Sequence, residues 1–451
     1  MINSKHINKI IACAVAFALL MSALMVYAAT AYETANIPDY QKRLFNGEAA
    51  LINIKVDEKN WEKFIDNATE KEWIIADLVI NGESFNGIGI RAKGNSSLEK
   101  VEKSESGKYS LNIKFNKFVD GQTYYGLDTF CLNNMIDDAT YMKEYLSYEI
   151  MRYIGVAAPL TNYAKVTVNG EDYGFCLILE RYDESFLDRV YNTSGGQLYN
   201  VKKDGNDNSG GSLLYTGDNK SNYSAIFDNA VFNKNSNKRE ERVITAIKNL
   251  NEGTNLEEYW DIDGILRYFA AHTVVVNLKS YISDQQQNYY LYERHGKITI
   301  LPWSYHLSFG GFPKSIDAEY VVNFPIDTPV YKVDMEDRPL LDKLLEVPEY
   351  KERYREYLRR IVEGYFDSGL FEETINNTHA KIGEYVKNDV SGFYSYEQYI
   401  EALPNLTLLG ILRAESITGQ LNGTIPSSAS GQNADFAALT DASSVNLSSL
   451  R

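Results

Sequence analysis

The chain has 451 residues, with 45 Lys and Arg against 61 Asp and Glu, and a formal net charge of −16. This acidic balance disfavours a general affinity for nucleic acid or anionic membranes, which require a basic surface. With 44% hydrophobic and 24% charged residues, the composition is that of a folded globular protein. The 34 tyrosines are unusually many, and they could stack on sugars, cross-link in a coat or fill a core.

The first 28 residues have the anatomy of a secretory signal peptide. Lys5 and Lys9 give a cationic start, an apolar run covers 10–27, and small residues favour cleavage after Ala28. The alternative is an uncleaved membrane anchor, although the run is at the lower limit for spanning a bilayer. Cleavage removes two lysines and no acidic residue, which changes the net charge from −16 to −18. The sequence therefore predicts a protein that works outside the cytosol.

A short polar linker over 29–47 is followed by a β-rich region over 48–181. Residues 50–56 alternate as in a strand, and Asp57 can cap a short helix. Two Asn-Gly pairs predict hairpins. The strands of these hairpins are expected at 73–80 and 85–90, around Asn81-Gly82, and at 163–168 and 173–179, around Asn169-Gly170.

Two further elements and the cysteines complete this region. Alternation over 109–115 predicts a half-buried strand, and a helix is expected from Asp138 to about Tyr153, with Gly155 as its stop. After signal removal, Cys131 and Cys176 are the remaining cysteines. A disulfide between them is permitted outside the cytosol, and the sequence leaves their pairing open.

The region 182–426 is predicted to be mixed at first and then mainly helical. Residues 192–222 are rich in Gly, Asn, Asp and Ser and resemble a long loop. Helices are expected at 239–250 and 263–277, a hairpin at 288–292 with 297–301, and helical segments over 336–423 that break at Pro348, Gly369, Gly392 and Pro404. The Ser/Ala-rich tail, 427–451, is predicted to be disordered. The fold class is α+β with two lobes.

One candidate site is the segment Ile90-Arg-Ala-Lys-Gly-Asn-Ser-Ser97, where a strand ends in a small polar loop. Arg91 and Lys93 supply positive charge, while Asn95 and the serines supply hydrogen-bond donors beside a glycine. These are the requirements of a phosphate cradle. A solvated turn is the alternative interpretation.

A second candidate is the pair Lys108 and Glu144, the first at the head of a strand and the second on a helix. A strand lysine held by a helix glutamate positions the nucleotide phosphates in protein kinases. Alternatively, both residues are surface charges, as most Lys and Glu residues are.

A third constellation is the aromatic hairpin with Asn288-Tyr-Tyr-Leu-Tyr on one side and Ile300-Leu-Pro-Trp-Ser-Tyr-His-Leu-Ser-Phe-Gly-Gly311 on the other. By itself it could be only a core hairpin. The order RAKGNSS, KYSLNIKF, the DDATYMKEYLSYE helix, LILE, NYYLYE, ILPW and SFGG resembles the CotH family over about Leu51 to Pro426. The segment 412–423 also looks like the end of longer clostridial-type members.

The resemblance implies a secreted or spore-coat protein with a divergent protein-kinase-like fold. Its two lobes would be an antiparallel-sheet N-lobe, 48–181, and a mainly helical C-lobe, 182–426. The implied activity is ATP-dependent phosphorylation of serine on secreted or coat proteins, with Mg²⁺ or Mn²⁺ as the metal. The implied location is the extracellular space or the spore surface.

Two positions depart from the family pattern where catalysis would occur. The family's Asn-x-Asp-Ser-Tyr, whose Asp is the implied catalytic carboxylate, is Asn277-Leu-Lys279-Ser-Tyr281 here. The family's Pro-Trp-Asp-x-Asn/Asp, which carries the implied metal ligand, is Pro302-Trp-Ser304-Tyr-His306, while Asn288 matches a position near the metal. A cation cannot accept the hydroxyl proton, a neutral serine is a weak Mg²⁺ ligand, and histidine is too soft for Mg²⁺. We expect ATP binding through cations with badly impaired transfer.

Compensation by Asp284, in the loop between Lys279 and Asn288, is an alternative, as is a simple Lys279–Asp284 salt bridge. A zinc or manganese site centred on His306 lacks a second His or Cys at ligand spacing nearby.

Three functions follow in order of preference. The first is a pseudokinase that binds or assembles surface or coat proteins. The second is an active divergent serine kinase, because Arg91, Lys93, Lys108, Glu144 and Asn288 are present. The third is an extracellular glycan-binding protein that uses surface tyrosines. Secreted or coat proteins are the expected partners; nucleic acid is not, and a membrane would be met only through an uncleaved signal segment.

Overall fold

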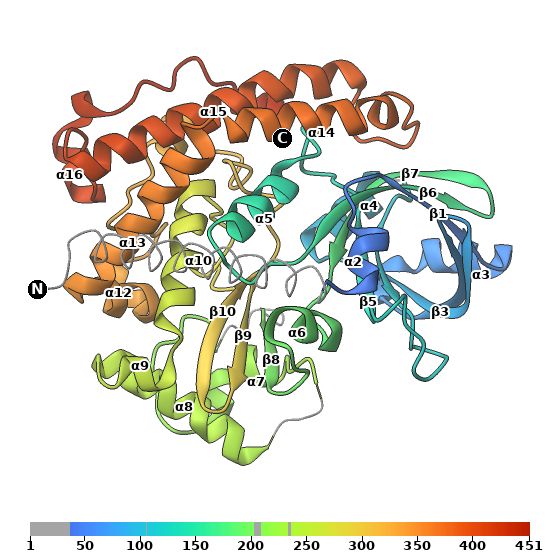
Figure 1. Ribbon diagram of the computed structural model, residues 1–451, viewed down its shortest axis with the longest axis horizontal. Coiled ribbons are helices and arrows are strands. Elements are labelled where there is room, and N and C mark those ends of the chain that lie inside the picture. The colour runs from blue at the N-terminus through green and yellow to red at the C-terminus, as the bar shows by residue number, and fades with distance from the viewer. Residues whose placement is uncertain (1–36, 105, 203–208, 233–235) are drawn as a thin grey trace, which may run out of the picture.

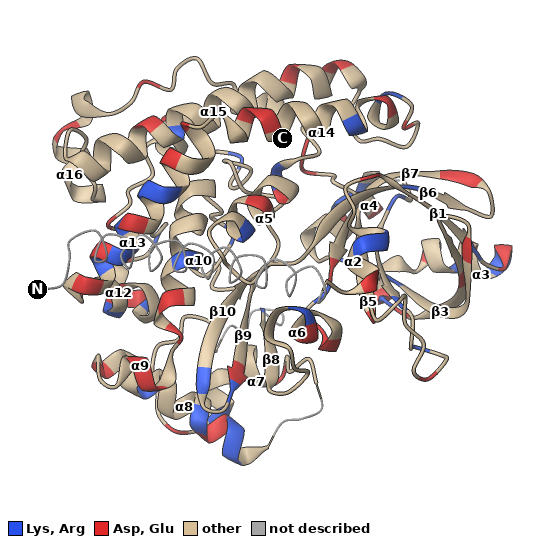
Figure 2. Ribbon diagram, in the orientation of Figure 1, with Lys and Arg blue, Asp and Glu red and all other residues tan. Residues whose placement is uncertain are grey.

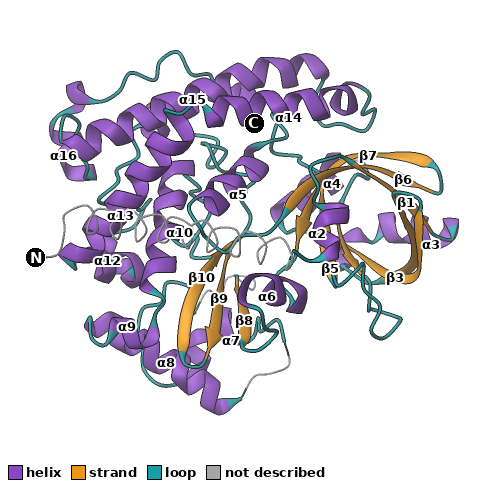
Figure 3. Cartoon of the chain, viewed as in Figure 1, coloured by secondary structure: helices purple, strands orange, loops and turns teal. Residues whose placement is uncertain are grey.

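The computed structural model describes residues 37–104, 106–202, 209–232 and 236–451, so the predicted signal peptide lies outside the described residues. These residues form a mixed α and β structure with a β-barrel on one side and a larger, mainly helical body on the other (Figure 1). Figure 3 shows that the strands of the barrel are separate from a small second sheet within the helical body.

Seven strands form a closed barrel in the order β1-β2-β3-β4-β5-β7-β6. They are β1 Ala50–Lys55, β2 Ile74–Ile80, β3 Glu83–Lys93, β4 Ser110–Lys114, β5 Thr129–Asn133, β6 Thr161–Val168 and β7 Glu171–Glu180. The sheet was predicted to be antiparallel. It differs from that prediction at one pair, because β1 and β6 are parallel and their pairing closes the barrel. Ile52 and Ile54 of β1 are buried in the barrel core, and closure leaves no strand edge exposed.

The predicted hairpins and the first cap are confirmed. Asn81 and Gly82 have φ angles of 49° and 88°, and Asn169 and Gly170 have 53° and 91°, as a tight hairpin turn between twisted strands requires. The Asp57 side chain accepts a hydrogen bond from the Asn60 backbone N–H at 3.1 Å and caps α3, Glu58–Asp66. The strand expected at 109–115 is β4, but it is buried over 110–113 rather than half-buried, and Lys114 is partly exposed.

Helix α5, Lys143–Tyr153, begins five residues later than predicted. The Asp138 carboxylate instead holds a turn before the helix, accepting from Thr140 and, at 2.8 Å, from the Lys143 backbone N–H. Tyr141 within that turn has a φ of 58°, which a helix does not allow. Gly155, at φ 85°, ends the helix as predicted.

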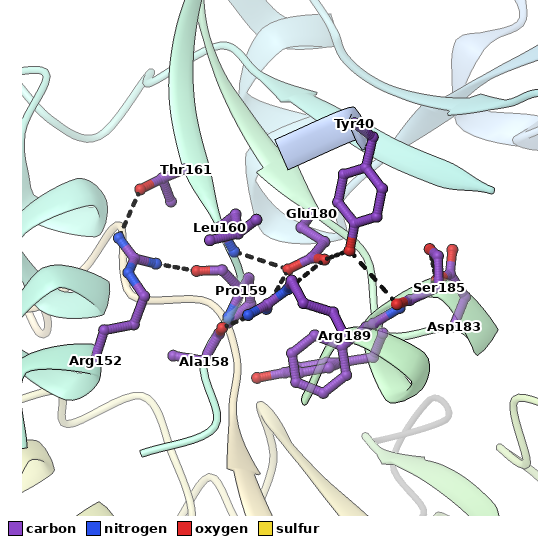
Figure 4. A network of polar contacts seen from close by, with 12 residues as sticks. Tyr40, Arg152, Ala158, Pro159, Leu160, Thr161, Glu180, Asp183, Ser185 and Arg189 are labelled. Atoms are coloured by element: carbon purple, nitrogen blue, oxygen red, sulfur yellow. Dashed lines mark hydrogen bonds and ion pairs between the residues drawn. The ribbon is translucent and has the colours of Figure 1, made fainter. Parts of the chain in front are cut away.

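The segment expected to be a linker contains helix α2, Asp39–Leu44, which is attached to the barrel through a buried glutamate. Figure 4 shows the Tyr40 hydroxyl donating to Glu180 at the end of β7, at 2.7 Å. Glu180 also accepts from both Nε and Nη2 of Arg189 on α6, Glu184–Tyr191, and from the Leu160 backbone N–H. One carboxylate thus joins three chain segments.

Replacing Glu180 with alanine is expected to lower the free energy of unfolding by about 3–5 kcal/mol, because Arg189 keeps its buried charge without a partner. Urea unfolding monitored by circular dichroism measures this change. Glu149→Ala is the matched control: its Arg152 partner also contacts Pro159 and Thr161, and 34% of the Glu149 side chain is exposed. Its loss should stay below about 1 kcal/mol. Equal losses in the two variants would contradict this role of Glu180.

The helical body contains a three-stranded sheet in the order β10-β9-β8. Strands β9, Tyr289–Arg294, and β10, Lys297–Pro302, form the predicted hairpin. Strand β8, Gln197–Val201, lies in the segment expected to be a loop. It pairs with β9, so hydrogen bonds from a distant segment form a strand whose local sequence predicts none.

The helices of the body largely follow the prediction. They are α7 Ser224–Phe227, α8 Asn237–Glu252, α9 Leu256–Tyr259, α10 Ile262–Val275, α11 Ala318–Val322, α12 Pro339–Leu345, α13 Pro348–Ile361, α14 Leu370–Lys387, α15 Tyr396–Asn422 and α16 Ala429–Ala434. Pro348 starts α13, where proline is tolerated. Pro404, expected to break a helix, lies within α15, which packs along α14 and α11. Within the described residues, we find no helix that combines the length and apolar character needed to cross a bilayer.

The tail over 427–451 is folded rather than disordered. It forms α16 and two short helical turns, and Leu447 and Leu450 are buried in the main core. The Arg451 guanidinium donates to the Gly310 carbonyl, and the Leu450 carbonyl accepts from Lys143. Burial of the apolar residues near the end of the tail thus stabilises a folded structure despite the Ser/Ala-rich composition.

The two described cysteines are free and buried. Cys131 on β5 packs in the main core, whereas Cys176 on β7 packs in the barrel core. The thiols therefore face opposite sides of the barrel wall, which explains why they do not pair.

Candidate functional site

The candidate phosphate segment joins β3 to helix α4, Ser96–Ser104. The expected polar loop is thus a short turn into a helix. Gly94 has a φ of 113°, and an added Cβ would lie 2.4 Å from the Ser97 hydroxyl, so this tight turn requires glycine. The Asn95 side chain is exposed and accepts from Lys71 Nζ at 2.9 Å.

Lys93, the last residue of β3, is the strand lysine that faces Glu144. Its Nζ donates to Asn133 Oδ1 at 2.5 Å, and Asn133 Nδ2 donates to Glu144 Oε2 at 2.6 Å. Glu144 on α5 also accepts from the Tyr305 backbone N–H at 3.2 Å. Burial raises the pKa of Glu144, and the positive charge of Lys93 opposes that rise. Lys93, Asn133 and Glu144 therefore form one connected polar chain.

Lys108 does not meet Glu144, contrary to the sequence prediction. It is 1% exposed, and its Nζ lies 2.7 Å from Asp389 Oδ2, an ion pair that joins the barrel to the segment after α14. The physical reason is the register of β4: Lys108 precedes this strand beside Gly174, while Lys93 ends the neighbouring strand next to Asn133.

Lys279 extends from the segment after α10 to the start of α4. Its Nζ donates to the Ser96 hydroxyl at 2.8 Å and lies 5.7 Å from the centre of the Phe312 ring. Burial and then the nearby Lys100 lower the pKa of Lys279. Asn288, at φ 63°, donates to the Lys279 carbonyl at 2.8 Å and so fixes the loop between them.

Asp284, the candidate for compensation, forms no hydrogen bond or ion pair with another candidate site residue in the described part of the chain. It is exposed and accepts from the neighbouring Gln285 side chain at 2.9 Å. The Lys279–Asp284 salt bridge considered from sequence does not form, since Lys279 Nζ is engaged with Ser96.

Ser304 and His306 lie beside the polar chain of Lys93, Asn133 and Glu144. Ser304 Oγ is 3.3 Å from His306 Nδ1, and the Ser304 backbone N–H donates to the Tyr148 hydroxyl. Burial lowers the pKa of His306, and Lys279 and Lys93 lower it further against the pull of Asp137. The imidazole is therefore neutral at neutral pH, in surroundings rich in cations.

Asp137 and Lys100 are site residues that the sequence reasoning missed. Lys100 on α4 donates to Asp137 Oδ1 at 2.5 Å, next to His306. Burial acts to raise the pKa of Asp137, but the Lys100 hydrogen bond and the surrounding cations outweigh it and hold the pKa below its ordinary value. The sequence did contain a signal for Asp137: it belongs to an Asp-Asp pair at 137–138, which closely follows an Asn-Asn pair at 133–134 at the end of a strand.

Arg91 belongs to a neighbouring cationic group rather than to this cluster. Its guanidinium stacks 4.6 Å from the Trp73 ring centre, and burial and then Arg181 lower its pKa. Arg181 in turn lies 5.0 Å from the Trp303 ring centre, and Lys93 Nζ lies 5.8 Å from the same ring. Figure 2 shows both signs of charge on α8, α12 and α13, which lie outside this group.

A cavity of about 340 Å³ lies elsewhere in the body, between α6, β10 and the ends of α5 and α10. Arg152, Arg189, Tyr191 and Asp261 contribute to its wall. No candidate site residue lines this cavity, so the cavity is not part of the candidate site.

The residues present do not fit a magnesium site. Mg²⁺ prefers several oxygen ligands that include carboxylates. Near Ser304 and His306 the contacts provide two carboxylates, and both are engaged: Asp137 is paired with Lys100, and Glu144 accepts from Asn133 and from the Tyr305 backbone N–H. Among the described residues, no three His, Cys, Asp or Glu side chains are grouped as metal ligands would be.

The comparisons with known proteins identify the family. The model of the family described as "CotH kinase protein" matches residues 90–417, a range that contains every predicted site residue. The chain is also 22% identical to the inner spore coat protein H of Bacillus subtilis (strain 168) over 289 residues, which cover 61% of this chain and 75% of that protein. The chain belongs to the CotH kinase protein family.

Proposed function

We propose that this chain is an exported protein of the spore surface whose kinase-like site binds nucleotide without transferring phosphate, and which acts in the binding or assembly of coat proteins. The name of its Bacillus subtilis relative supports a role in the spore coat. The predicted signal peptide supports export. In this proposal the barrel and the helical body correspond to the two lobes of a divergent kinase.

The observation that carries the proposal is the position of Lys279. Lys279 stands where the CotH pattern has an aspartate, and its ammonium group contacts Ser96. Ser304, which lies beside His306, stands where the pattern has a metal-binding aspartate. Phosphoryl transfer depends on a carboxylate near the attacking hydroxyl and on a metal that neutralises the phosphates. Losing such electrostatic stabilisation typically costs a factor of about 10²–10³ in rate for each donor removed.

Incubation of the chain with labelled ATP, Mg²⁺ or Mn²⁺ and a serine-rich coat protein is therefore expected to give no transfer above background. The double variant Lys279→Asp with Ser304→Asp is expected to gain metal-dependent transfer, because it supplies both missing carboxylates. In that background, Lys93→Ala should remove the gain. Robust transfer by the unmodified chain would overturn the proposal.

The second candidate is an active divergent serine kinase, which the hydrogen-bonded chain Lys93–Asn133–Glu144 favours. If the unmodified chain does transfer phosphate, the variants Asp284→Ala and Asp137→Ala test which of these two carboxylates acts as the catalytic base. Loss of transfer in Asp284→Ala alone would indicate that the exposed loop moves to supply the base.

Glycan binding through surface tyrosines remains a prediction with little support. Of the tyrosines in the described ranges, three are exposed: Tyr125, Tyr153 and Tyr320. Tyr125 is stacked under Arg43, with the guanidinium carbon 3.7 Å from the ring centre. Most of the others fill the cores, which accounts for the high tyrosine count.

A further inference from the structure

Three lysines from separate elements come together at the candidate site. Lys93 ends β3, Lys100 lies on α4 and Lys279 follows α10. Lys279 Nζ contacts Ser96 in the first turn of α4, and Lys100 on the same helix contacts Asp137. We call Lys93, Lys100 and Lys279 the lysine cluster.

The positive charge of the lysine cluster is only partly balanced. Lys100 is paired with Asp137. Lys279 Nζ contacts a hydroxyl, and Lys93 Nζ contacts an amide oxygen, so neither forms an ion pair with any described carboxylate. Glu144, which faces Lys93, is reached through Asn133. Charges that are partly withdrawn from water without an opposite charge are costly, and an anionic ligand would offset that cost.

The location of Lys279 indicates the kind of anion. A divalent cation in a kinase bridges phosphate oxygens and neutralises their charge. Here Ser304 stands at the implied metal-ligand position, and Lys279 places an ammonium group at the implied position of the catalytic carboxylate in the same cluster. The ammonium can neutralise phosphate directly, and it repels Mg²⁺. The serine hydroxyls and backbone N–H groups at the start of α4 add donors beside it.

We propose that the lysine cluster binds a polyphosphate chain without a divalent cation, and that Lys279 supplies the charge that the metal supplies in an active kinase. This inference rests on the proposed function, since it specifies how a site that does not transfer phosphate holds its ligand. The shared ligand chemistry is the polyphosphate, whether it is part of a nucleotide or free.

Titration calorimetry of the full chain tests this with ATP in excess EDTA and in excess Mg²⁺. We expect binding in EDTA and weaker binding in Mg²⁺, because the metal reduces the charge of the ligand. Lys279→Ala is expected to weaken binding in EDTA roughly 10- to 100-fold, the usual effect of removing one charge-assisted contact. Lys59→Ala, an exposed lysine on α3, is the matched control and should bind as the unmodified chain does.

Three further arms make the outcome decisive. Lys279→Asp should bind ATP in EDTA more weakly than Lys279→Ala, because its carboxylate repels the polyphosphate. Lys279→Met keeps the side-chain length, so weak binding by both neutral variants, each with an unchanged circular dichroism spectrum, excludes a folding defect. Tripolyphosphate that binds as tightly as ATP identifies a free polyphosphate, whereas tighter binding of ATP identifies a nucleotide.

Several results would overturn the inference: no binding in EDTA, binding that requires Mg²⁺, equal affinity in Lys279→Ala, or binding of AMP as tight as that of ATP. None of these depends on the phosphate-transfer assay. A chain that transfers no phosphate but requires Mg²⁺ to bind ATP would keep the proposed function and remove this inference.

Discussion

Asp389→Ala is expected to destabilise the protein by about 3–5 kcal/mol, because it leaves the ammonium of Lys108 buried without a counter-charge. Both side chains are almost fully withdrawn from water, with exposed fractions of 1% for Lys108 and 0% for Asp389. The carboxylate also accepts from the Phe175 backbone N–H at 3.1 Å and from the Ser391 hydroxyl at 2.8 Å. Equilibrium unfolding in urea measures the loss.

Two comparisons isolate the ion pair. Asp172→Ala removes the carboxylate of a partly exposed pair with Lys165, with exposed fractions of 29% and 24%, and its cost should stay below about 1 kcal/mol. The double variant Lys108→Met with Asp389→Leu removes both charges and should recover most of the stability. If Asp389→Ala costs no more than Asp172→Ala, Lys108 is not a structural residue, and the prediction that it belongs to a phosphate-binding site is open again.

Acid is expected to destabilise the protein below about pH 6.5 through His272. The imidazole is fully buried on α10, where burial lowers its pKa from 6.5 to about 3. The hydroxyl of Tyr305 lies 2.6 Å from Nδ1, and that of Ser280 lies 3.0 Å from Nε2. The ring of Tyr268 stacks on the imidazole, with its centre 5.4 Å away. These neighbours are hydroxyls and a ring, so no carboxylate among the described residues contacts the imidazole to favour its charged form.

The direction of this pH dependence follows from the difference in proton binding between the folded and the unfolded chain. Between pH 6.5 and 3 the unfolded chain binds a proton at this residue and the folded chain does not, so lowering the pH favours unfolding. The loss approaches about 1.4 kcal/mol per pH unit and amounts to about 2 kcal/mol at pH 5. His272→Gln should make the pH dependence shallower by this amount, whereas His295→Asn, at an exposed turn, should not change it. Parallel pH profiles for His272→Gln and the unmodified chain would contradict the prediction.

Local signals in the sequence predicted elements whose conformation depends on neighbouring residues. The two Asn-Gly hairpins, the Asp57 cap and the Gly155 stop are cases in which one side chain or one positive φ decides the conformation. The same reasoning failed for β8 and for the tail, because β8 depends on pairing with β9 and the tail depends on burying Leu447 and Leu450.

The candidate site was predictable in part. The motif order identified the family, and the resemblance directed attention to Lys279 and Ser304 as candidate site residues. The lysine that faces Glu144 was predicted wrongly: Lys93 and Lys108 precede or end neighbouring strands, and only the pairing of β3 with β4 determines which of them lies beside Asn133. Asp137 and Lys100 were missed because they are 37 residues apart in the chain, and their contact forms only when α4 packs near the start of α5.

The sequence by itself determined the family, the acidic balance and the local turns and caps. These properties depend on residue identity and on interactions within a few residues. The tertiary structure alone decided the closure of the barrel, the pairing of Lys108 with Asp389 and the gathering of Lys93, Lys100 and Lys279 at one site. Those features join segments that are tens to hundreds of residues apart. Burial and hydrogen bonding across such distances are set by the packed whole rather than by any local pattern.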